Sequence, residues 1–306
     1  MNEESKKYKN TISGVLVVDK PPGMTSHDVV QIVRRGTGIR RIGHIGTLDP
    51  RASGVLVLLV GPAVRLSEYL ITDRKRYEAQ FTFGAVSNTY DADGEVIKTG
   101  GTPELDEERV SAEMKKFTGE IVQRPPSYSA LKIGGKKAYE RARAGEIFEI
   151  PERRVTIYAF DLVEFNPPDI SVEVDCSSGT YIRSLAHELG AALGCGAYLS
   201  ELRRTKSGRF SLRQAATLDE LKTAFENGDW YQYLIPAIDS LADFTEIQLD
   251  LEMERDIRCG KAIQAEAGTN VDPAFAKAVS LQGELVAVLQ YDAEAALWKP
   301  KKVLIS

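Results

Sequence analysis

One candidate catalytic residue in this sequence is an aspartate, Asp49, which lies within the segment GHIGTLDPRASG. An aspartate before proline commonly begins a turn, because its carboxylate caps nearby backbone groups and the residue before proline avoids the helical region. This one also lies on a glycine-flanked loop between two apolar runs, where a rigid scaffold holds it and a ligand can approach closely. An ionised aspartate in that setting can act as a nucleophile or a base, and a neighbouring arginine would keep it charged.

Aromatic and basic residues are interleaved at several places. Tyr77 follows three consecutive basic residues, and Tyr128 lies in a segment rich in lysine and arginine. Tyr181 and Arg183 are two residues apart, which places them on one face of an extended segment. Each tyrosine alone is more simply explained as filling a half-buried position. As a set they indicate RNA, because aromatic faces stack bases at about 1 to 3 kcal/mol each while basic side chains neutralise phosphates.

Periodic apolar residues predict the elements that must position these side chains. The run GVLVVDK from Gly14 predicts a strand, and Thr25 with Ser26 predicts the cap of a following helix. Further elements follow from the same patterns: strands at 55–60, 77–84, 155–165 and 170–176, helices at 63–70 and 103–118, a helix with Leu185, Leu189 and Leu193 on one stripe, and a strand in LSELRRT. Residues 91–94 have the composition of a turn.

The chain divides into unequal parts. Its 306 residues suit one large and one small domain. The proline-bounded segment 124–151 has too few apolar residues for a core of its own and is predicted to be a mobile surface arm. Residues 225–243 read as a connector. We therefore expect a large domain over 1–242, which carries the arm, and a small β domain over 243–306.

Composition excludes several classes of protein. With 43% hydrophobic and 27% charged residues the chain is an ordinary globule, which excludes disordered and collagen-like chains. The three cysteines are far apart and the three histidines are not clustered, so neither a disulfide framework nor a zinc site is expected. The longest apolar run is far short of the roughly 20 residues that span a bilayer. We expect a cytoplasmic protein.

The net charge of −5 argues at first against a nucleic-acid partner, but the charge is uneven. Residues 1–80 hold 13 basic against 8 acidic residues, residues 124–154 hold 8 against 4, and residues 211–306 hold 9 against 16. A further basic run comprises Arg203, Arg204, Lys206 and Arg209. Because salt screens charges beyond about 8 Å, a phosphate responds to the nearby patch, and an RNA footprint fits within an acidic protein.

Five ordered segments resemble one known family. These are VVDKPPGMTSHDVV, RIGHIGTLDPRASGVLVLLVG, KRYEAQFTFGAVSNTYDADGE, RPPSYSALKIGGKKAYERARAGE and CSSGTYIRSLAHELGAALGCGAYLSELRRTKSGRF. In this order they closely resemble the motifs of the TruB family, the tRNA pseudouridine-55 synthases, over residues 14–242. The resemblance implies an α+β fold with a central mixed, largely antiparallel sheet flanked by helices. The tail resembles a PUA-like RNA-binding domain only loosely, mainly in GKAIQAEAG and LWKPKKVLIS.

The resemblance implies an isomerisation without cofactor or metal, in which uracil in the T-arm loop of tRNA is detached at N1, turned and rejoined through C5. The family's catalytic aspartate falls on Asp49, which would attack the ribose C1′, attack the base, or abstract a ribose proton to give a glycal. Tyr77 matches the tyrosine that stacks on uracil. Tyr181 matches the aromatic residue proposed to help remove the C5 proton, and Arg183 matches the partner of the aspartate.

Further matched positions concern substrate binding. Leu202 matches an apolar residue of the pocket, and His44 matches the histidine that fills the space left by flipped nucleotides. Lys20 matches the first motif and is expected to support the catalytic loop. The arm matches the family's insertion that closes on the T-arm, with Tyr128, Lys132 and Arg141 as candidate RNA contacts. We expect a monomer that binds tRNA without an obligatory protein partner and without contact with a membrane.

Two alternatives use the same residues. One is a tRNA-binding folding helper whose benefit to RNA does not need the chemistry. The other is an enzyme of the related family that works within a guide-RNA particle, although such proteins usually carry longer basic extensions. Which uridines beyond the T-arm are accepted, and whether the C-terminal domain contacts RNA, stay open at this point.

Overall fold

The computed structural model describes residues 12–71, 74–100, 105–128, 131–146, 148–265 and 275–304. The helices are α2 (Ser26–Thr37), α3 (Ser67–Leu70), α4 (Glu107–Lys116), α5 (Ala138–Arg143), α6 (Ile182–Leu193), α7 (Leu218–Asn227), α8 (Ala237–Ser240) and α9 (Leu251–Arg258), with 3-10 turns η1 (Gly61–Leu66), η2 (Leu212–Gln214) and η3 (Trp230–Tyr233). Among the described residues, no helix has the length and apolar character needed to cross a bilayer.

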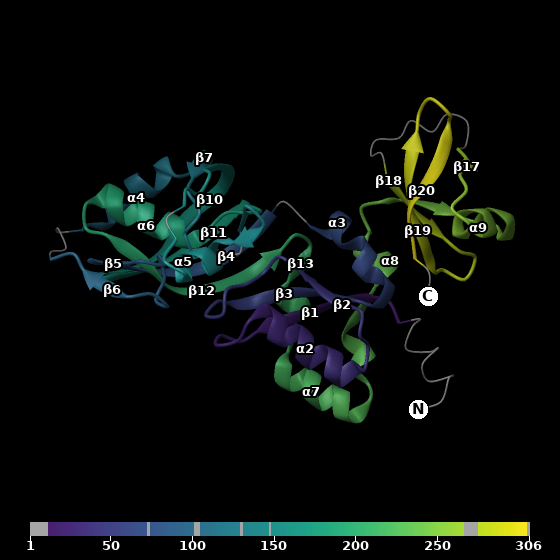
Figure 1. Cartoon of the computed structure of the whole chain (residues 1–306), viewed down its shortest axis with the longest axis horizontal. Coiled ribbons are helices and arrows are strands. Elements are labelled where there is room, and N and C mark those ends of the chain that lie inside the picture. Colours follow the sequence, from purple (N-terminus) through teal and green to yellow (C-terminus); the bar gives the residue numbers. More distant parts are fainter. Residues whose placement is uncertain are drawn as a thin grey trace.

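One mixed, largely antiparallel sheet runs through the large domain (Figure 1), which confirms the predicted fold class. Its order is β14 (Ala216–Thr217), β1 (Gly14–Lys20), β3 (Ser53–Val60), β12 (Ala197–Ser207), β4 (Arg74–Phe83), β11 (Asp169–Ser177), β10 (Arg153–Asn166) and β7 (Gly119–Gln123). Three short strands join its sides: β2 (Ile42–Ile45) on β3, β13 (Phe210–Ser211) on β12, and β15 (Leu234–Pro236) on β1. Only β14 on β1 and β12 on β3 pair in parallel in this sheet as described.

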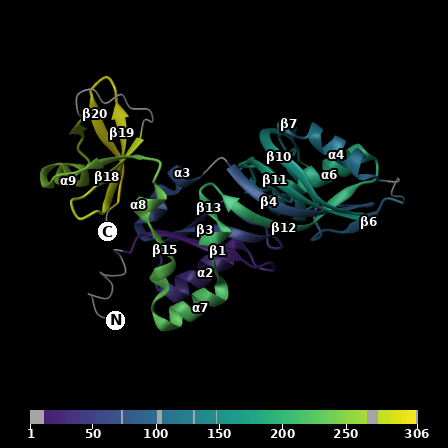
Figure 2. The same ribbon diagram turned by 180° about the vertical axis from the view of Figure 1, so that it is seen from behind.

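Strands β1 and β3 are apolar over most of their length because both of their faces are buried. Leu16 and Val18 pack with α2 and α7 in the main core, whereas Val15 and Val17 face a second core. That second core also contains Val288 of the C-terminal domain. Figures 1 and 2 show α2 and α7 side by side next to β1 and β3, with α4 and α6 at the far end of the sheet. Continuous runs such as SGVLVLLV are typical of strands covered on two sides.

The C-terminal region forms its own sheet, which confirms the predicted small β domain. Its order is β16 (Thr245–Gln248), β18 (Phe275–Val279), β19 (Leu285–Asp292), β20 (Leu297–Val303) and β17 (Ile263–Gln264). Lys302 pairs with Glu68 at 2.9 Å, and Arg65 donates to the Val303 carbonyl. The domain is therefore joined to α3 and η1 by polar contacts as well as by the second core. The boundary at residue 242 and the PUA-like character stay predictions.

One segment differs from the sequence interpretation, and the arm has short elements that the sequence did not predict. The predicted connector 225–243 is wrong in part, since β15 pairs with β1 and Trp230 is buried in the main core. Strand β15 spans only three residues, which is too short to show a strand period. The arm contains a hairpin of β8 (Lys132–Ile133) and β9 (Lys136–Lys137), followed by α5. Another short hairpin joins β5 (Ala85–Ser87) to β6 (Val96–Lys98).

Candidate active site

A cavity of about 230 Å³ lies where four segments meet: the loop before β3, the strands β4 and β12, and the first turn of α6. Its lining residues are Gly46, Thr47, Leu48, Asp49, Lys75, Tyr77, Gly179, Thr180, Tyr181, Ile182, Arg183, Leu202 and Arg204. The structure thus brings together Asp49, Tyr77, Tyr181, Arg183 and Leu202, which the sequence selected from positions more than 150 residues apart.

The Asp49 carboxylate is held by a buried arginine. Nη2 of Arg183 lies 3.0 Å from Oδ2 of Asp49, and Nη1 lies 3.0 Å from Oδ2 of Asp91. The Arg183 side chain is 7% exposed, whereas the Asp49 side chain is 45% exposed and faces the cavity. One guanidinium therefore pairs with two carboxylates, because its planar fork can serve both at once.

Asp91 is an ion-pair partner of Arg183 that the sequence analysis did not select. Its surroundings, DADG, have turn composition, and they do form a turn in which Asp93 N donates to Asp91 Oδ1 at 3.0 Å. The carboxylate also accepts from Thr89 Oγ1 at 2.5 Å. An aspartate in a turn can also form a buried ion pair, so residue type alone could not show that Asp91 does both.

The backbone of the loop that carries Asp49 is held from three sides. Ser26 Oγ, at the start of α2, donates to the Leu48 carbonyl at 3.0 Å and accepts from the Leu48 N–H at 2.9 Å. Lys20 Nζ donates to Pro50 at 3.1 Å and to the Pro21 and Met24 carbonyls at 2.9 Å each. Burial lowers the pKa of Lys20 to about 8, and three carbonyls match the three donors of its ammonium form. Lys20 is fully buried beneath the loop and has no exposed surface for RNA.

Arg204 holds the third side of this loop. It donates to the Gly46 carbonyl at 2.6 Å, to the Val55 carbonyl at 2.8 Å and more weakly to Thr47. Its backbone passes so close to β3 that a Cβ at Gly54, where φ is +100°, would lie 2.2 Å from the Arg204 carbonyl oxygen. Only glycine fits at position 54, which explains one glycine of the GTLDPRASG segment.

Tyr77 presents its ring to the cavity from β4 and is 8% exposed. Burial raises the pKa of Tyr77, although the Arg204 guanidinium next to its hydroxyl acts in the opposite direction. The phenol is therefore neutral at physiological pH, which suits a stacking surface and not a base. Leu202 adds an apolar side chain to the same cavity.

Tyr181 is fixed by a buried glutamine. The Tyr181 N–H donates to Gln123 Oε1 at 2.7 Å, and Gln123 Nε2 donates to the Tyr181 carbonyl at 3.0 Å. The Arg153 guanidinium lies over the Tyr181 ring at 5.1 Å. Gln123 ends β7, directly before the arm, so the arm begins beside the cavity. Nothing in the sequence marked Gln123, since a lone buried amide has no pattern.

The remaining described candidates do not line the cavity. His44 on β2 is half-buried and lies 3.2 Å from Thr47 Oγ1, and burial lowers its pKa. Tyr128 is half-buried in the arm. Arg141 pairs with Glu146 at 2.7 Å and lies 4.7 Å over the Phe148 ring. The side chain of Lys132 lies outside the described residues. No described arm residue lines the cavity.

Glu188 on α6 lies at the base of the arm, next to Arg124. The Arg124 side chain pairs with Glu152 at 3.1 Å, and the Arg124 carbonyl accepts from Ser184 Oγ at 2.8 Å. The Arg124 N–H donates to the Glu188 carboxylate, yet burial raises the pKa of Glu188 from 4.5 to about 7. Between these values the folded protein keeps a proton that the unfolded chain has released, so this group lowers stability as pH rises through the window.

Glu188→Gln is therefore expected to gain stability relative to the wild type as pH rises from 5 to 8. Each pKa unit corresponds to about 1.4 kcal/mol, and partial exposure reduces the expected gain to about 1 to 2 kcal/mol. Urea unfolding of both proteins at the two pH values measures this difference. Glu226→Gln, at an exposed helix position, is the control and should show no such gain. An equal gain at both pH values would contradict the assignment.

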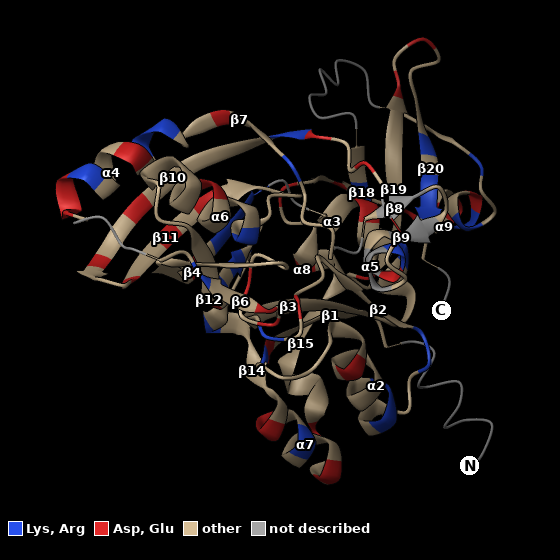
Figure 3. Ribbon diagram, turned by 60° about the vertical axis from the view of Figure 1, so that its left-hand side comes forward, with Lys and Arg blue, Asp and Glu red and all other residues tan. Residues whose placement is uncertain are grey.

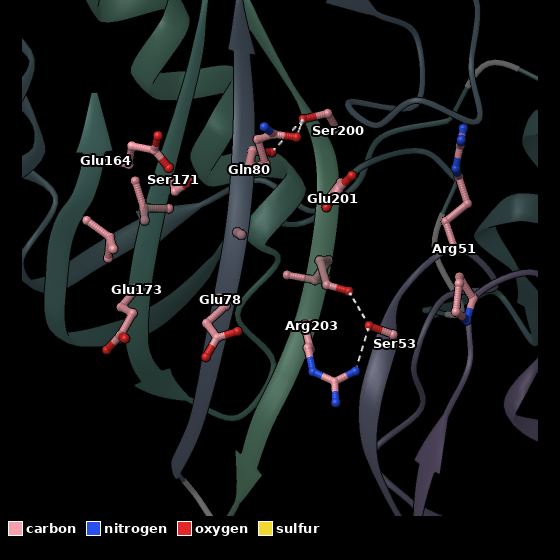
Figure 4. Close-up of a pocket in the computed structure, with 15 residues that line it drawn as sticks. Arg51, Ser53, Glu78, Gln80, Glu164, Ser171, Glu173, Ser200, Glu201 and Arg203 are labelled. Carbon is pink, nitrogen blue, oxygen red and sulfur yellow. Dashed lines mark hydrogen bonds between the residues drawn. The ribbon is translucent and has the colours of Figure 1, made fainter. Parts of the chain in front are cut away.

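A larger groove of about 670 Å³ lies on the opposite face of the sheet (Figure 4). Side chains alternate along a strand, so Glu78 and Gln80 of β4 face this groove while Tyr77 faces the cavity. The groove is lined by four glutamates, Glu78, Glu164, Glu173 and Glu201, with Arg51 and Arg203 at its edge. This acidic lining would repel a phosphate backbone and lacks the Asp49–Arg183 pair.

The basic run 203–209 contributes less to an RNA surface than its sequence indicates. Arg204 is 1% exposed and serves the catalytic loop, and Arg203 pairs with Asp19 at 2.7 Å. Arg209 donates to the Ser240 carbonyl at 3.1 Å. Arg74 and Arg76 on β4, by contrast, keep 62% and 50% of their side chains exposed although both pair with Asp175. Figure 3 shows basic stretches near the ends of β4 and β12.

Comparison with known proteins identifies the family of the chain. Residues 34–182 match the model of the TruB family pseudouridylate synthase N-terminal domain, and residues 183–242 match that of the tRNA pseudouridylate synthase B C-terminal domain. Relatives named tRNA pseudouridine synthase B include one from Thermobifida fusca, 51% identical over 220 residues, which covers 69% of this chain and 75% of the relative. Another, from an Arthrobacter species, is 42% identical over 289 residues, covering 91% and 92%.

Solved structures share the fold along nearly the whole chain. One, described as a Cbf5-Nop10-Gar1 complex, has a TM-score of 0.72 at 26% identity and covers 99% of this chain and 88% of that chain. A second, described as an H/ACA RNP bound to a substrate RNA, has a TM-score of 0.71 at 25% identity and covers 99% and 87%. The fold is that of a pseudouridine synthase. Within that class, the chain belongs to the TruB family.

Proposed function

We propose that this protein isomerises uridine 55 in the T-arm loop of tRNA to pseudouridine. The observation that carries the proposal is the Asp49 carboxylate, held by Arg183 at 3.0 Å and facing a cavity that is also lined by Tyr77. The names of the relatives, which are tRNA pseudouridine synthases, support tRNA as the substrate. The five sequence motifs support the T-arm uridine.

The reaction rearranges bonds without net oxidation. The N1–C1′ bond breaks, the uracil turns, and a C5–C1′ bond forms, while C5 loses a proton and N1 gains one. No electron acceptor is required, so we propose that the enzyme needs no cofactor or metal. Asp49 would act on C1′, on the base, or on a ribose proton, and each of these routes uses its carboxylate, whose side chain is 45% exposed.

Each neighbouring side chain has a defined part in this proposal. Tyr77 stacks on the flipped uracil, and Leu202 contacts it from β12. Tyr181 lies at the first turn of α6, where it can assist removal of the C5 proton. Arg183 keeps Asp49 charged and oriented when RNA excludes water from the cavity.

Flipping the base costs a few kcal/mol, which binding must offset. Stacking on Tyr77 supplies about 1 to 3 kcal/mol. His44 lies outside the cavity lining, beside the Asp49 loop, where a neutral imidazole can fill the space left in the T-loop. Arm residues Tyr128, Lys132 and Arg141 would contact RNA after the arm moves toward the T-arm.

We further propose that the protein acts as a cytoplasmic monomer on free tRNA, without an obligatory protein partner. The structural neighbours are described in complexes with Nop10 and Gar1 or with RNA. The relatives with higher identity are named as tRNA enzymes, which favours action on tRNA itself. Activity of the purified chain alone would separate these cases.

Chemical mapping of pseudouridine in an unmodified tRNA transcript tests this function. Incubation with the purified protein should give a single modified position, uridine 55. A transcript with cytidine at position 55 is the control and should acquire no pseudouridine elsewhere. Modification only at another uridine, or none without added proteins, would contradict the proposal.

A further inference from the structure

Tyr90 has a strained backbone directly before Asp91. Its φ is 65°, in the left-handed region that a bulky residue rarely adopts. The conformation is held by β12, because the Leu199 N–H donates to the Tyr90 carbonyl at 3.0 Å and the Ala92 N–H donates to the Leu199 carbonyl at 3.1 Å. Strain that is held by surrounding structure commonly marks a functional site.

The Tyr90 ring stacks on His187 of α6, with centroids 3.9 Å apart and planes 11° apart. Nδ1 of His187 is buried and has no hydrogen-bond partner among the described residues. Burial lowers the pKa of His187, which favours the neutral ring. The imidazole is thus used for its flat face and not for a polar contact at Nδ1.

The stack joins the two segments that carry the central ion pair. His187 follows Arg183 by four residues, so both side chains lie on one face of α6. Tyr90 precedes Asp91, whose Oδ2 lies 3.0 Å from Arg183 Nη1. Arg183 Nη1 also donates weakly to the Thr89 carbonyl at 3.4 Å. The loop 89–91 and α6 therefore meet at the ion pair and, one turn farther along, at the stack.

We propose that Tyr90 and His187 form an aromatic clamp that positions Asp91 against Arg183 and, through Arg183, the Asp49 carboxylate. Neither ring lines the cavity, so both are positioning residues that act through the ion pairs. This inference rests on the proposed function. In this proposal the left-handed backbone of Tyr90 turns the Asp91 carboxylate toward α6. The Tyr90 ring fixes the distance between the loop 89–91 and the helix.

The test compares variants that keep a ring with variants that lose it. Tyr90→Phe keeps the stack and should isomerise at the wild-type rate. Tyr90→Gly relieves the backbone strain but removes the ring, and His187→Ala removes the other ring. Both are expected to lower the single-turnover rate about 10- to 100-fold, because small displacements of a catalytic group have large effects, while tRNA affinity stays unchanged.

A double-variant cycle shows whether the clamp acts through Asp91. His187→Ala should slow the wild type but have almost no further effect in an Asp91→Asn background, because the group that it positions is already lost. Wild-type rates in both Tyr90→Gly and His187→Ala would overturn the proposal, as would a full additional loss in the Asp91→Asn background. If Tyr90→Gly does not fold, the comparison of His187→Ala, which loses the ring, with His187→Phe, which keeps one, tests the clamp.

The wild-type rate in the same assay separates the two levels of inference. If the wild type forms no pseudouridine, the proposed function fails. If the wild type is active and the ring-deletion variants are equally active, only the clamp fails. Thermal unfolding of each variant is recorded, since a purely structural role would lower the melting temperature without changing the rate of the folded fraction.

Discussion

Asp49→Asn is expected to lower the single-turnover rate of isomerisation by roughly 10⁴-fold or more, because the amide cannot act as a nucleophile or base. The substitution preserves shape, and Arg183 keeps its ion pair with Asp91 at 3.0 Å. The Asp49 side chain is also 45% exposed, so its charge contributes little to folding. Stability and tRNA affinity should therefore stay close to those of the wild type.

Product formation, filter binding of tRNA and thermal unfolding measure these three quantities. Asp93→Asn is a matched control, because Asp93 lies on a neighbouring turn, is 46% exposed and pairs with Arg51 and not with Arg183. It should keep nearly full activity. Equal losses of binding and rate in Asp49→Asn would contradict a chemical role for this carboxylate.

The same variant separates the enzyme from the folding helper. An Asp49→Asn protein that binds tRNA but forms no pseudouridine shows that binding and isomerisation can be separated. If the main benefit to tRNA is folding, that benefit persists in the variant. The structure favours a chemical role for Asp49, since so many contacts fix its loop.

Arg183→Met is expected to lower both activity and stability. Two carboxylates that each lie 3.0 Å from the guanidinium would be left without a cation, and Asp91 is largely buried. Breaking a buried ion pair on one side costs about 3 to 5 kcal/mol. The folded fraction of Arg183→Met should also react about 10²- to 10³-fold more slowly than the wild type, because Asp49 has lost its electrostatic partner.

The double variant Arg183→Met with Asp91→Asn distinguishes these effects. Removal of the second charge should restore most of the stability but little of the rate, because Asp49 still lacks its cation. Arg183→Lys should be faster than Arg183→Met but slower than the wild type. Its ammonium supplies the positive charge but cannot match the planar fork that serves two carboxylates. Urea unfolding and single-turnover rates measure both properties. Full recovery of rate in the double variant would contradict the role of Arg183.

The fold was largely predictable where burial requires apolar residues to recur with the spacing of a strand or a helix. The runs around Val15 and Val55 gave strands because both faces must be apolar, and the stripe with Leu185 and Leu189 gave α6 because one face meets the sheet. The short strand β15 was not predicted, because three residues, two half-buried and one exposed, carry no detectable period. Its place is set by pairing with β1, which is a long-range contact.

The site was predictable in its principal residues but not in their supports. Asp49, Tyr77 and Arg183 were identified through resemblance to family motifs, and the structure places them around one cavity. Asp91 was read as a turn residue, and Arg204 was counted as a surface charge. Burial decides both roles, and sequence spacing does not report the burial of a charged side chain. The roles in RNA binding of Tyr128, Lys132 and Arg141 stay predictions.

Release of tritium from a tRNA that carries [5-³H]uridine at position 55 tests the central claim most directly. Formation of the C5–C1′ bond must expel the hydrogen at C5. We predict that the wild-type protein releases this tritium stoichiometrically without added cofactor, and that Asp49→Ala releases none above background. Absence of release by the wild type, or undiminished release by Asp49→Ala, would contradict the account.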